Sequence, residues 1–383
     1  MEKITAAIIG LGRIASLLEE DSLREKPCTH AGAIAANPCC NLAAGCDIDE
    51  ERRRLFAEKW SVPVYADAVE MIRAHSPQIL AIATHPDSHY RYCRLAAALS
   101  VPVLICEKPL ADNLREARKI TRLSLPDTSQ RRKGAGEDSK NMVIITNHER
   151  RYSDNYIRAK AILDDETLGK ILSIRAVLYM GKTRRLLDVL WHDGTHLADA
   201  IMFLANGTLK HRRRWGAKIT SKTGTAWLEG ELRPQMPTPN SPAPTGLAKA
   251  SPPTVSCSGA STVLPLFKAH RLTRCSFLGV PVLLEIGAGR DHLVFEIEFS
   301  CEKGRLRIGN GIFEVWESAP SPYAEQFRSL KATGEMFAGP TGYFANMVKD
   351  AVECVQESNR QPRSSAANGL KVIEYLNSIQ PWL

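Results

Sequence analysis

The chain has 383 residues, of which 44% are hydrophobic, so it is long enough for two domains that each bury their own core. Its formal net charge of +8 comes from scattered basic residues and three short runs, which argues against a nucleic-acid partner and favours an anionic substrate or a phosphate as the reason for the excess. Ten cysteines show neither a Cys-x-x-Cys pair nor regular spacing with histidines, which argues against a zinc site and a disulfide scaffold.

The first 148 residues alternate between strand-like and helix-like segments. The pattern predicts strands at 4–9, 41–46, 79–83, 101–105 and 142–146, and helices at 50–59, 89–99 and 112–123. Such alternation implies right-handed crossovers and a doubly wound parallel sheet, the α/β architecture of a Rossmann domain.

A glycine-rich turn follows the first strand. Residues 10–15 fit the pattern G-x-G-x-x-A at the opening of a helix. The first glycine permits a tight turn, the second lets backbone amides approach a pyrophosphate, and the helix N-terminus attracts its charge. We therefore expect residues 1–148 to bind a dinucleotide, with contacts from Gly10, Gly12, Arg13 and Ile14.

Asp47 ends the second strand, where the ribose hydroxyl groups of a dinucleotide should lie. Its charge would repel a 2′-phosphate, which favours NAD over NADP. NADP stays open, because one of the three arginines at 52–54 could neutralise that phosphate. Capping of the helix that begins at Glu50 is the alternative role for Asp47 and Asp49.

Two further motifs, residues 83–89 and 106–110, stand at the carboxyl ends of buried strands. This is the edge of an open α/β sheet where ligands bind. Lys108, in the second motif, follows the strand 101–105 and is the candidate to contact cofactor or substrate. Packing or capping in the next helix is the alternative for His89. The cofactor-binding residues expected at this edge are Thr84, His85, Pro86, His89, Glu107 and Lys108.

Residues 149–383 predict an α+β domain with a mostly antiparallel sheet. Strands are expected at 171–179, 217–222, 225–231, 276–277, 282–287, 294–300, 306–309 and 312–316, and helices at 342–357 and 364–379. A surface loop is expected at 125–140, and a Pro/Ser-rich insertion at 233–261.

Seven motifs, in order over roughly the first 200 residues, resemble one known family: residues 10–15, Asp47, 83–86 with His89, 107–109, 151–152, 168–171 and 194–199. This is the glucose-fructose oxidoreductase and inositol dehydrogenase family, often called Gfo/Idh/MocA. The resemblance implies a Rossmann domain joined to an open-faced sheet domain, with substrate between them and a bound nicotinamide exchanging hydride with a sugar-like carbon. The Pro-rich insertion has no counterpart.

The chemistry of alcohol oxidation identifies the candidate catalytic residues. His196 can take the hydroxyl proton, because histidine has a pKa near working pH, and Lys108 can stabilise the negative charge on the reacting oxygen. A core histidine is the alternative for His196. Many members carry an aspartate four residues before this histidine, whereas here His192 stands there and Asp193 follows. Either of them could be the partner of His196.

The remaining expectations concern substrate, metal and location. Arg151 and Tyr152 are expected to contact substrate together with Lys108, His192 and His196, with packing at the hinge as their alternative. No metal is expected, because no third ligand accompanies His192 and His196. The short apolar segment 4–9 predicts a cytoplasmic protein without membrane contact.

These observations predict an NAD(P)-dependent oxidoreductase that acts on a hydroxyl or carbonyl carbon of a sugar, cyclitol or nucleotide-linked sugar. The alternatives are an NAD-dependent glycoside hydrolase that uses transient oxidation, and a non-catalytic NAD(P) sensor. A homodimer or homotetramer is expected, because a partner subunit would normally cover the open sheet.

Overall fold

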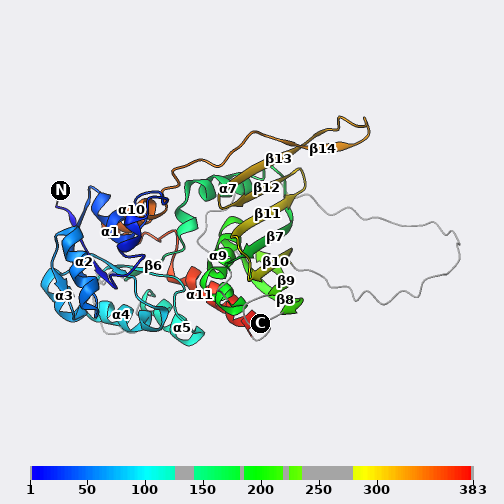
Figure 1. The fold of residues 1–383 in the computed structure, drawn as a ribbon. Coiled ribbons are helices and arrows are strands. Elements are labelled where there is room, and N and C mark those ends of the chain that lie inside the picture. Colours follow the sequence, from blue (N-terminus) through cyan, green and yellow to red (C-terminus); the bar gives the residue numbers. More distant parts are fainter. Residues whose placement is uncertain (1, 126–141, 182–184, 219–223, 235–278, 381–383) are drawn as a thin grey trace, which may run out of the picture.

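The computed structural model describes residues 2–125, 142–181, 185–218, 224–234 and 279–380. The predicted loop at 125–140 and the Pro-rich insertion lie almost entirely outside these residues, as does the strand expected at 276–277. Two sheets with their covering helices make up the molecule (Figure 1). Among the described residues, no helix is both long enough and apolar enough to cross a membrane.

The first sheet has six parallel strands in the order β3-β2-β1-β4-β5-β6, which confirms the doubly wound prediction. The strands are β1 Ile4–Ile9, β2 Cys40–Cys46, β3 Val64–Tyr65, β4 Ile79–Ile82, β5 Val103–Cys106 and β6 Val143–Thr146. The helices are α1 His30–Ala36, α2 Glu50–Trp60, α3 Ala68–His75, α4 Pro86–Ala98 and α5 Leu114–Leu123. Because helices cover both faces, β4 and β5 are buried throughout and read as continuous apolar runs.

The prediction that residues 10–15 open a helix is wrong. The chain makes one turn, in which the Ser16 amide donates to the Gly12 carbonyl, and then the 3₁₀ helix η1 Leu17–Glu20. The α-helix begins only at His30, where Thr29 caps it and donates its hydroxyl hydrogen bond to Glu19 at 2.6 Å. Pro27 in the intervening segment 21–28 lacks the amide that a continuous helix would need.

The second sheet has eight strands in the order β14-β13-β12-β11-β7-β10-β9-β8. The strands are β7 Ile171–Tyr179, β8 Gly207–Lys218, β9 Gly224–Pro234, β10 Val280–Ala288, β11 Val294–Cys301, β12 Gly304–Gly309, β13 Ile312–Pro320 and β14 Arg328–Ala332. All pairs are antiparallel except β7 with β10, which confirms the mostly antiparallel prediction.

Two strands of this sheet differ from the prediction. β8 begins ten residues earlier than expected, at 207 instead of 217, so the basic run 212–214 lies in a strand and not in a loop. The sequence pattern did not indicate this strand because several of its residues are charged. In the structure, Glu231 on the neighbouring strand compensates part of this charge through ion pairs with Arg212 and Arg233. β14 was not predicted, because most of its side chains are exposed.

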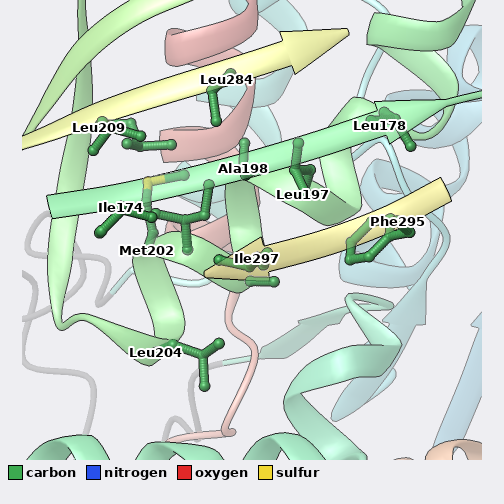
Figure 2. Close-up of a cluster of buried hydrophobic side chains, with 14 of the residues drawn as sticks. Ile174, Leu178, Leu197, Ala198, Met202, Leu204, Leu209, Leu284, Phe295 and Ile297 are labelled. Carbon is green, nitrogen blue, oxygen red and sulfur yellow. The ribbon is translucent and has the colours of Figure 1, made fainter. Parts of the chain in front are cut away.

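Helices cover one face of the second sheet. They are η2 Glu149–Tyr152, α7 Asp154–Asp164, α8 Leu186–His192, α9 Gly194–Leu204 and α11 Ala366–Ile379. Figure 2 shows side chains of α9, such as Leu197 and Met202, packed against Ile174, Leu284 and Ile297 of the strands. The other face carries ion pairs between strands, such as Arg175 with Glu285 and Arg307 with Glu296. This is the open-faced sheet that the sequence resemblance implied.

The two C-terminal helices return to the first domain, although the sequence reasoning assigned 149–383 to the second. α10 Tyr343–Gln356 buries Phe344, Met347 and Val348 in the core that contains β1 and α1. α11 contributes Ile373 to a core of the first domain and Leu376 to that of the second. The sequence shows that these helices have apolar faces, but it does not show which hydrophobic core those faces pack against.

Replacing Met347 with alanine should destabilise the first domain, because this side chain is fully buried between α10 and the parallel sheet. We expect the free energy of unfolding in urea to fall by about 2–5 kcal/mol. Lys349→Ala, an exposed position on the same helix, should change it by less than about 0.5 kcal/mol. Equal effects of the two substitutions would show that α10 is not part of this core.

Candidate active site

The candidate site lies where the carboxyl ends of β1, β2, β4, β5 and β6 meet the junction of α8 and α9. Parallel strands present these ends at one edge, so segments far apart in sequence converge there.

The glycine turn after β1 forms a cradle. Gly10 has φ +87°, and a Cβ there would lie 2.8 Å from the backbone of Ala83, so only glycine fits. A Cβ at Gly12 would meet nothing closer than Arg52, at 3.9 Å, so the space beside it is open. Within the described residues, the backbone amides of residues 12–15 donate no hydrogen bond. Open space and free amides fit a pyrophosphate. Arg13 is exposed here, while Ile14 packs against the core.

Asp47 lies at one end of this cradle. It is buried, and its Oδ2 accepts a hydrogen bond from the Leu11 amide at 2.7 Å. Asp49 caps α2 by accepting from the Arg52 amide, so the capping alternative holds for Asp49 and not for Asp47. Of the three arginines, Arg52 turns toward the site, with its guanidinium 3.7 Å from the Asp47 carboxylate. Arg53 donates to the backbone carbonyl oxygens of Asp47 and Ile48, and Arg54 pairs with Glu51.

The segment after β4 divides into an exposed and a buried part. His85 is exposed and precedes Pro86, the first residue of α4. Thr84 accepts a hydrogen bond from Ser88. His89 is fully buried, and its ring nitrogens lie 3.1 and 3.3 Å from the carbonyl oxygens of Thr84 and Leu110. Burial lowers the pKa of His89. This geometry supports the packing alternative for His89 in place of a cofactor contact.

Glu107 is an internal anchor. Its carboxylate is buried and accepts hydrogen bonds from His30 at 2.8 Å, Asn147 at 2.5 Å and the Lys108 amide at 3.2 Å. Burial acts to raise the pKa of Glu107, but the hydrogen bonds from His30 and Asn147 bring it below its usual value. Because these partners occupy it, Glu107 fixes the end of β5, and a direct cofactor contact is not supported.

Lys108 reaches across to the second domain. Its Nζ donates to the carbonyl oxygen of His192 at 2.9 Å, at the end of α8. The peptide bond to Pro109, which the sequence left undetermined, is cis. The structure thus joins the first domain's lysine with the segment that carries His192, Asp193 and His196.

The helix breaks at Asp193, which ends α8 and precedes α9. His192 and His196 therefore do not lie on one continuous helix face. The His192 side chain is 53% exposed and the Asp193 side chain 18%, and the two lie 3.2 Å apart. The Asp193 carboxylate thus contacts the ring of His192, and which of these two residues is the partner of His196 stays a prediction.

His196 is partly buried in the site, and its Nδ1 has no hydrogen-bond partner among the described residues. Its pKa is held well below the usual value by burial first and then by the positive charges of Lys108 and Arg150. The imidazole is therefore neutral near pH 7 and can accept a proton.

His148 is a site residue that the sequence reasoning missed. It is buried, neither ring nitrogen forms a hydrogen bond within the described part of the chain, and Nε2 lies 4.0 Å from Asp199. Burial lowers the pKa of His148, and a proton on His148 would lower the pKa of His196. His148 follows β6 in the same way that Lys108 follows β5. The expectation that ligands bind at the carboxyl ends of parallel strands could therefore have identified His148 from the sequence.

Arg151 and Tyr152 are both occupied inside the protein. The Arg151 guanidinium forms a bidentate ion pair with Asp199, with distances of 2.8–3.0 Å. Tyr152 is fully buried and donates to Asp350 at 3.0 Å. Packing at the hinge, the alternative kept for both, agrees with this geometry, and the expected substrate contact does not. Among the described residues, no group of three His, Cys, Asp or Glu could hold a metal ion.

Comparisons with known proteins point to one family. Residues 4–125 match the model of the oxidoreductase family with an NAD-binding Rossmann fold, GFO_IDH_MocA. The inositol 2-dehydrogenase of Gluconacetobacter diazotrophicus is 26% identical over 133 residues, which is 34% of this chain and 36% of that protein. The inositol 2-dehydrogenase of Salmonella typhimurium is 25% identical over 182 residues, 47% of each chain. These matches span less than half the length of the relatives.

Solved structures extend the similarity in fold to the whole chain. A UDP-N-acetylglucosamine 3-dehydrogenase from Acidithiobacillus ferrooxidans has a TM-score of 0.66 at 16% identity, covering 100% of this chain and 98% of that one. An oxidoreductase from Agrobacterium radiobacter, in complex with NAD⁺, L-tartaric acid and magnesium, has a TM-score of 0.61 at 15% identity, covering 98% and 94%. At these identities the likeness shows the fold alone.

Replacing Asp47 with serine should reduce the preference for NAD over NADP by at least about tenfold, or 1.4 kcal/mol. The substitution removes the charge that repels a 2′-phosphate and leaves Arg52 free to pair with one. Asp49→Ser is the matched control, because it loses the same charge and serine still caps α2. Isothermal titration with each nucleotide measures the ratio of the affinities for NAD and NADP. If this ratio shifts equally in both variants, Asp47 does not determine the preference.

Acid should destabilise the fold through its buried histidines. The pKa values of His89, His148 and His196 are lowered, so the folded state disfavours their protonation, while the unfolded chain binds protons near pH 6.5. Stability should therefore be fully present above that pH and decline below it, by at most about 1.4 kcal/mol per pH unit for each histidine. His148→Gln should flatten the decline measured by urea unfolding from pH 7.5 to 5.5, whereas the exposed His292→Gln should leave it unchanged.

Proposed function

We propose that this chain, whose residues 4–125 match the Gfo/Idh/MocA oxidoreductase family with an NAD-binding Rossmann fold, transfers hydride between nicotinamide and a hydroxyl or carbonyl carbon of a sugar, cyclitol or nucleotide-linked sugar. The contact from Lys108 to the His192 carbonyl carries the proposal. It brings a cation from the cofactor domain to the segment with His196, where a neutral imidazole stands beside positive charge.

In this proposal His196 is the general base. Oxidation of an alcohol releases a proton from the hydroxyl group, and His196 can accept it because its depressed pKa keeps the ring neutral. The nearby charges of Lys108 and Arg150 disfavour keeping that proton. Asp193, close to the His192 ring and less exposed than it, would orient the substrate or the protonated histidine in this proposal.

Lys108 stabilises the reacting oxygen. Its ammonium group has three donors, and one of them is engaged by the His192 carbonyl. The other two can donate to the substrate oxygen as negative charge develops on it. Glu107 supports this role at a distance, since its buried hydrogen bonds hold the end of β5 in place.

The cradle at residues 10–15 and Asp47 fit NAD, which when bound supplies the hydride acceptor. We propose that the free amides of residues 12–15 hold the pyrophosphate and that Asp47 accepts hydrogen bonds from the ribose. The exposed Arg13 and His85 remain proposed cofactor contacts, together with the partly buried Thr84 and Pro86.

The names of relatives support the substrate class. Two proteins named inositol 2-dehydrogenase are similar to this chain in sequence, and this supports a cyclitol or sugar as substrate. Within the described site, no observation favours glycoside hydrolysis or a purely sensing role.

We also propose that the open face of the second sheet binds a second copy of the chain as a homodimer or homotetramer. Arg and Glu alternate across its strands, as in the pairs of Arg305 with Glu298 and Arg307 with Glu314, so the face can complement itself. The eight described cysteines are free thiols, which supports a reducing, cytoplasmic location.

The test is a panel of inositols, sugars, sugar acids and nucleotide-linked sugars with NAD and with NADP, followed by nicotinamide absorbance. On the best substrate, Lys108→Met and His196→Gln should each lower kcat by at least about 100-fold while NAD affinity stays within a few-fold. The control His292→Gln should retain full activity. A wild-type protein that oxidises or reduces no member of the panel, or a His196→Gln variant with unchanged kcat, would refute the proposal.

A further inference from the structure

A cavity of about 250 Å³ lies at the junction of η2, α7, α9, β8 and α11. It shares only Arg151 with the residues considered for the active site. Met202 and Phe203 form an apolar part of its wall. Its polar lining is positively charged and rich in donors: Arg151, Lys160, Asn206, Arg363, Asn368 and Lys371.

Carboxylates balance two of the four cations. Arg151 pairs with Asp199, and Lys160 pairs with Asp164 at 2.9 Å and also donates to the side-chain oxygen of Asn206. These ion pairs account for Arg151 and Lys160.

Arg363 and Lys371 have no carboxylate partner within the described residues. The Arg363 guanidinium donates to the carbonyl oxygen of Arg151 at 3.3 Å and lies 5.8 Å from the centre of the Tyr152 ring, contacts that fix its position without neutralising it. Burial lowers the pKa of Lys371, the positive charge of Arg151 lowers it further, and the carboxylate of Glu374, one turn along α11, acts in the opposite sense. Two cations without a carboxylate within ion-pair distance among the described residues thus line one small cavity.

We propose that this cavity binds a small phosphate-type anion through Arg363 and Lys371. A guanidinium and an ammonium together match the oxygens and the double charge of a phosphate, and the amide groups of Asn206 and Asn368 add donors. The volume leaves room beside a single phosphate group, so the ligand is either inorganic phosphate or a small phosphate ester.

An anion bound in this cavity would affect how the two domains are held together. Lys371 and Asn368 lie on α11, the helix that packs into the cores of both domains. Arg151 joins the cavity to Asp199, which faces the buried His148 of the candidate site. An anion bound here would therefore stabilise the arrangement of the two domains, independently of which substrate is turned over.

The experiment measures thermal unfolding of the full chain during titration with sodium phosphate, with sodium chloride at matched ionic strength as reference. Saturating NAD is present in a parallel series, so that phosphate bound in the glycine cradle is displaced. The proteins are the wild type, Lys371→Gln, Arg363→Gln and the control Lys349→Gln, an exposed lysine of α10. Glucose 6-phosphate replaces inorganic phosphate in a second arm.

We expect a saturable rise in Tm for wild type and Lys349→Gln, and an apparent affinity at least about tenfold weaker in Lys371→Gln and Arg363→Gln. Without phosphate, Lys371→Gln should unfold at no lower temperature than wild type, because it relieves repulsion; loss of the response then cannot be ascribed to misfolding. Tighter binding of glucose 6-phosphate would identify an ester as the ligand, and equal binding would identify free phosphate. A response that is absent, or equal in Lys371→Gln and Lys349→Gln for both anions, overturns the proposal.

Discussion

A buried carboxylate, that of Glu107, is the constraint on which the candidate site depends. An ionised carboxylate out of water is costly unless it is fully hydrogen-bonded. Here the ring of His30 from α1, the amide of Asn147 after β6 and the backbone of Lys108 satisfy it. The same three bonds therefore tie α1, β5 and β6 together at the carboxyl edge of the sheet. Lys108 can project toward α8 with a defined direction because its own backbone is held in this way.

The sequence predicted those features that depend on local pattern. Continuous apolar runs marked β4 and β5, and the residues after them, such as Lys108, could be placed at a common edge. Pattern could not show that Arg151 would meet Asp199, nor that Tyr152 would meet Asp350, because both partners are distant in sequence. Burial depends on such partners, which is why two expected substrate contacts proved to be internal. The excess of positive charge suggested a phosphate but gave no location for it.

A chain of charged and titratable groups runs from the candidate site into the interior. His196 and His148 are both held neutral by burial, and His148 faces Asp199, which Arg151 neutralises. Because Arg151 already satisfies Asp199, this carboxylate cannot strongly favour a proton on His148. This arrangement keeps the positive charge on Arg151 and leaves both imidazoles without a proton, which agrees with the proton acceptance that we propose for His196.

The two domains are held together mainly by apolar packing, whereas the contact at the candidate site is polar and replaceable. α11 places side chains in both cores, and burial of such faces is the dominant stabilising contribution. In contrast, Lys108 donates to a single backbone carbonyl, and a hydrogen bond of this kind adds only about 1.5–3 kcal/mol net. A substrate hydroxyl can therefore compete for the ammonium without disturbing the domain arrangement. The apolar junction fixes where Lys108 and His196 stand, and the weak polar contact leaves Lys108 able to exchange its partner.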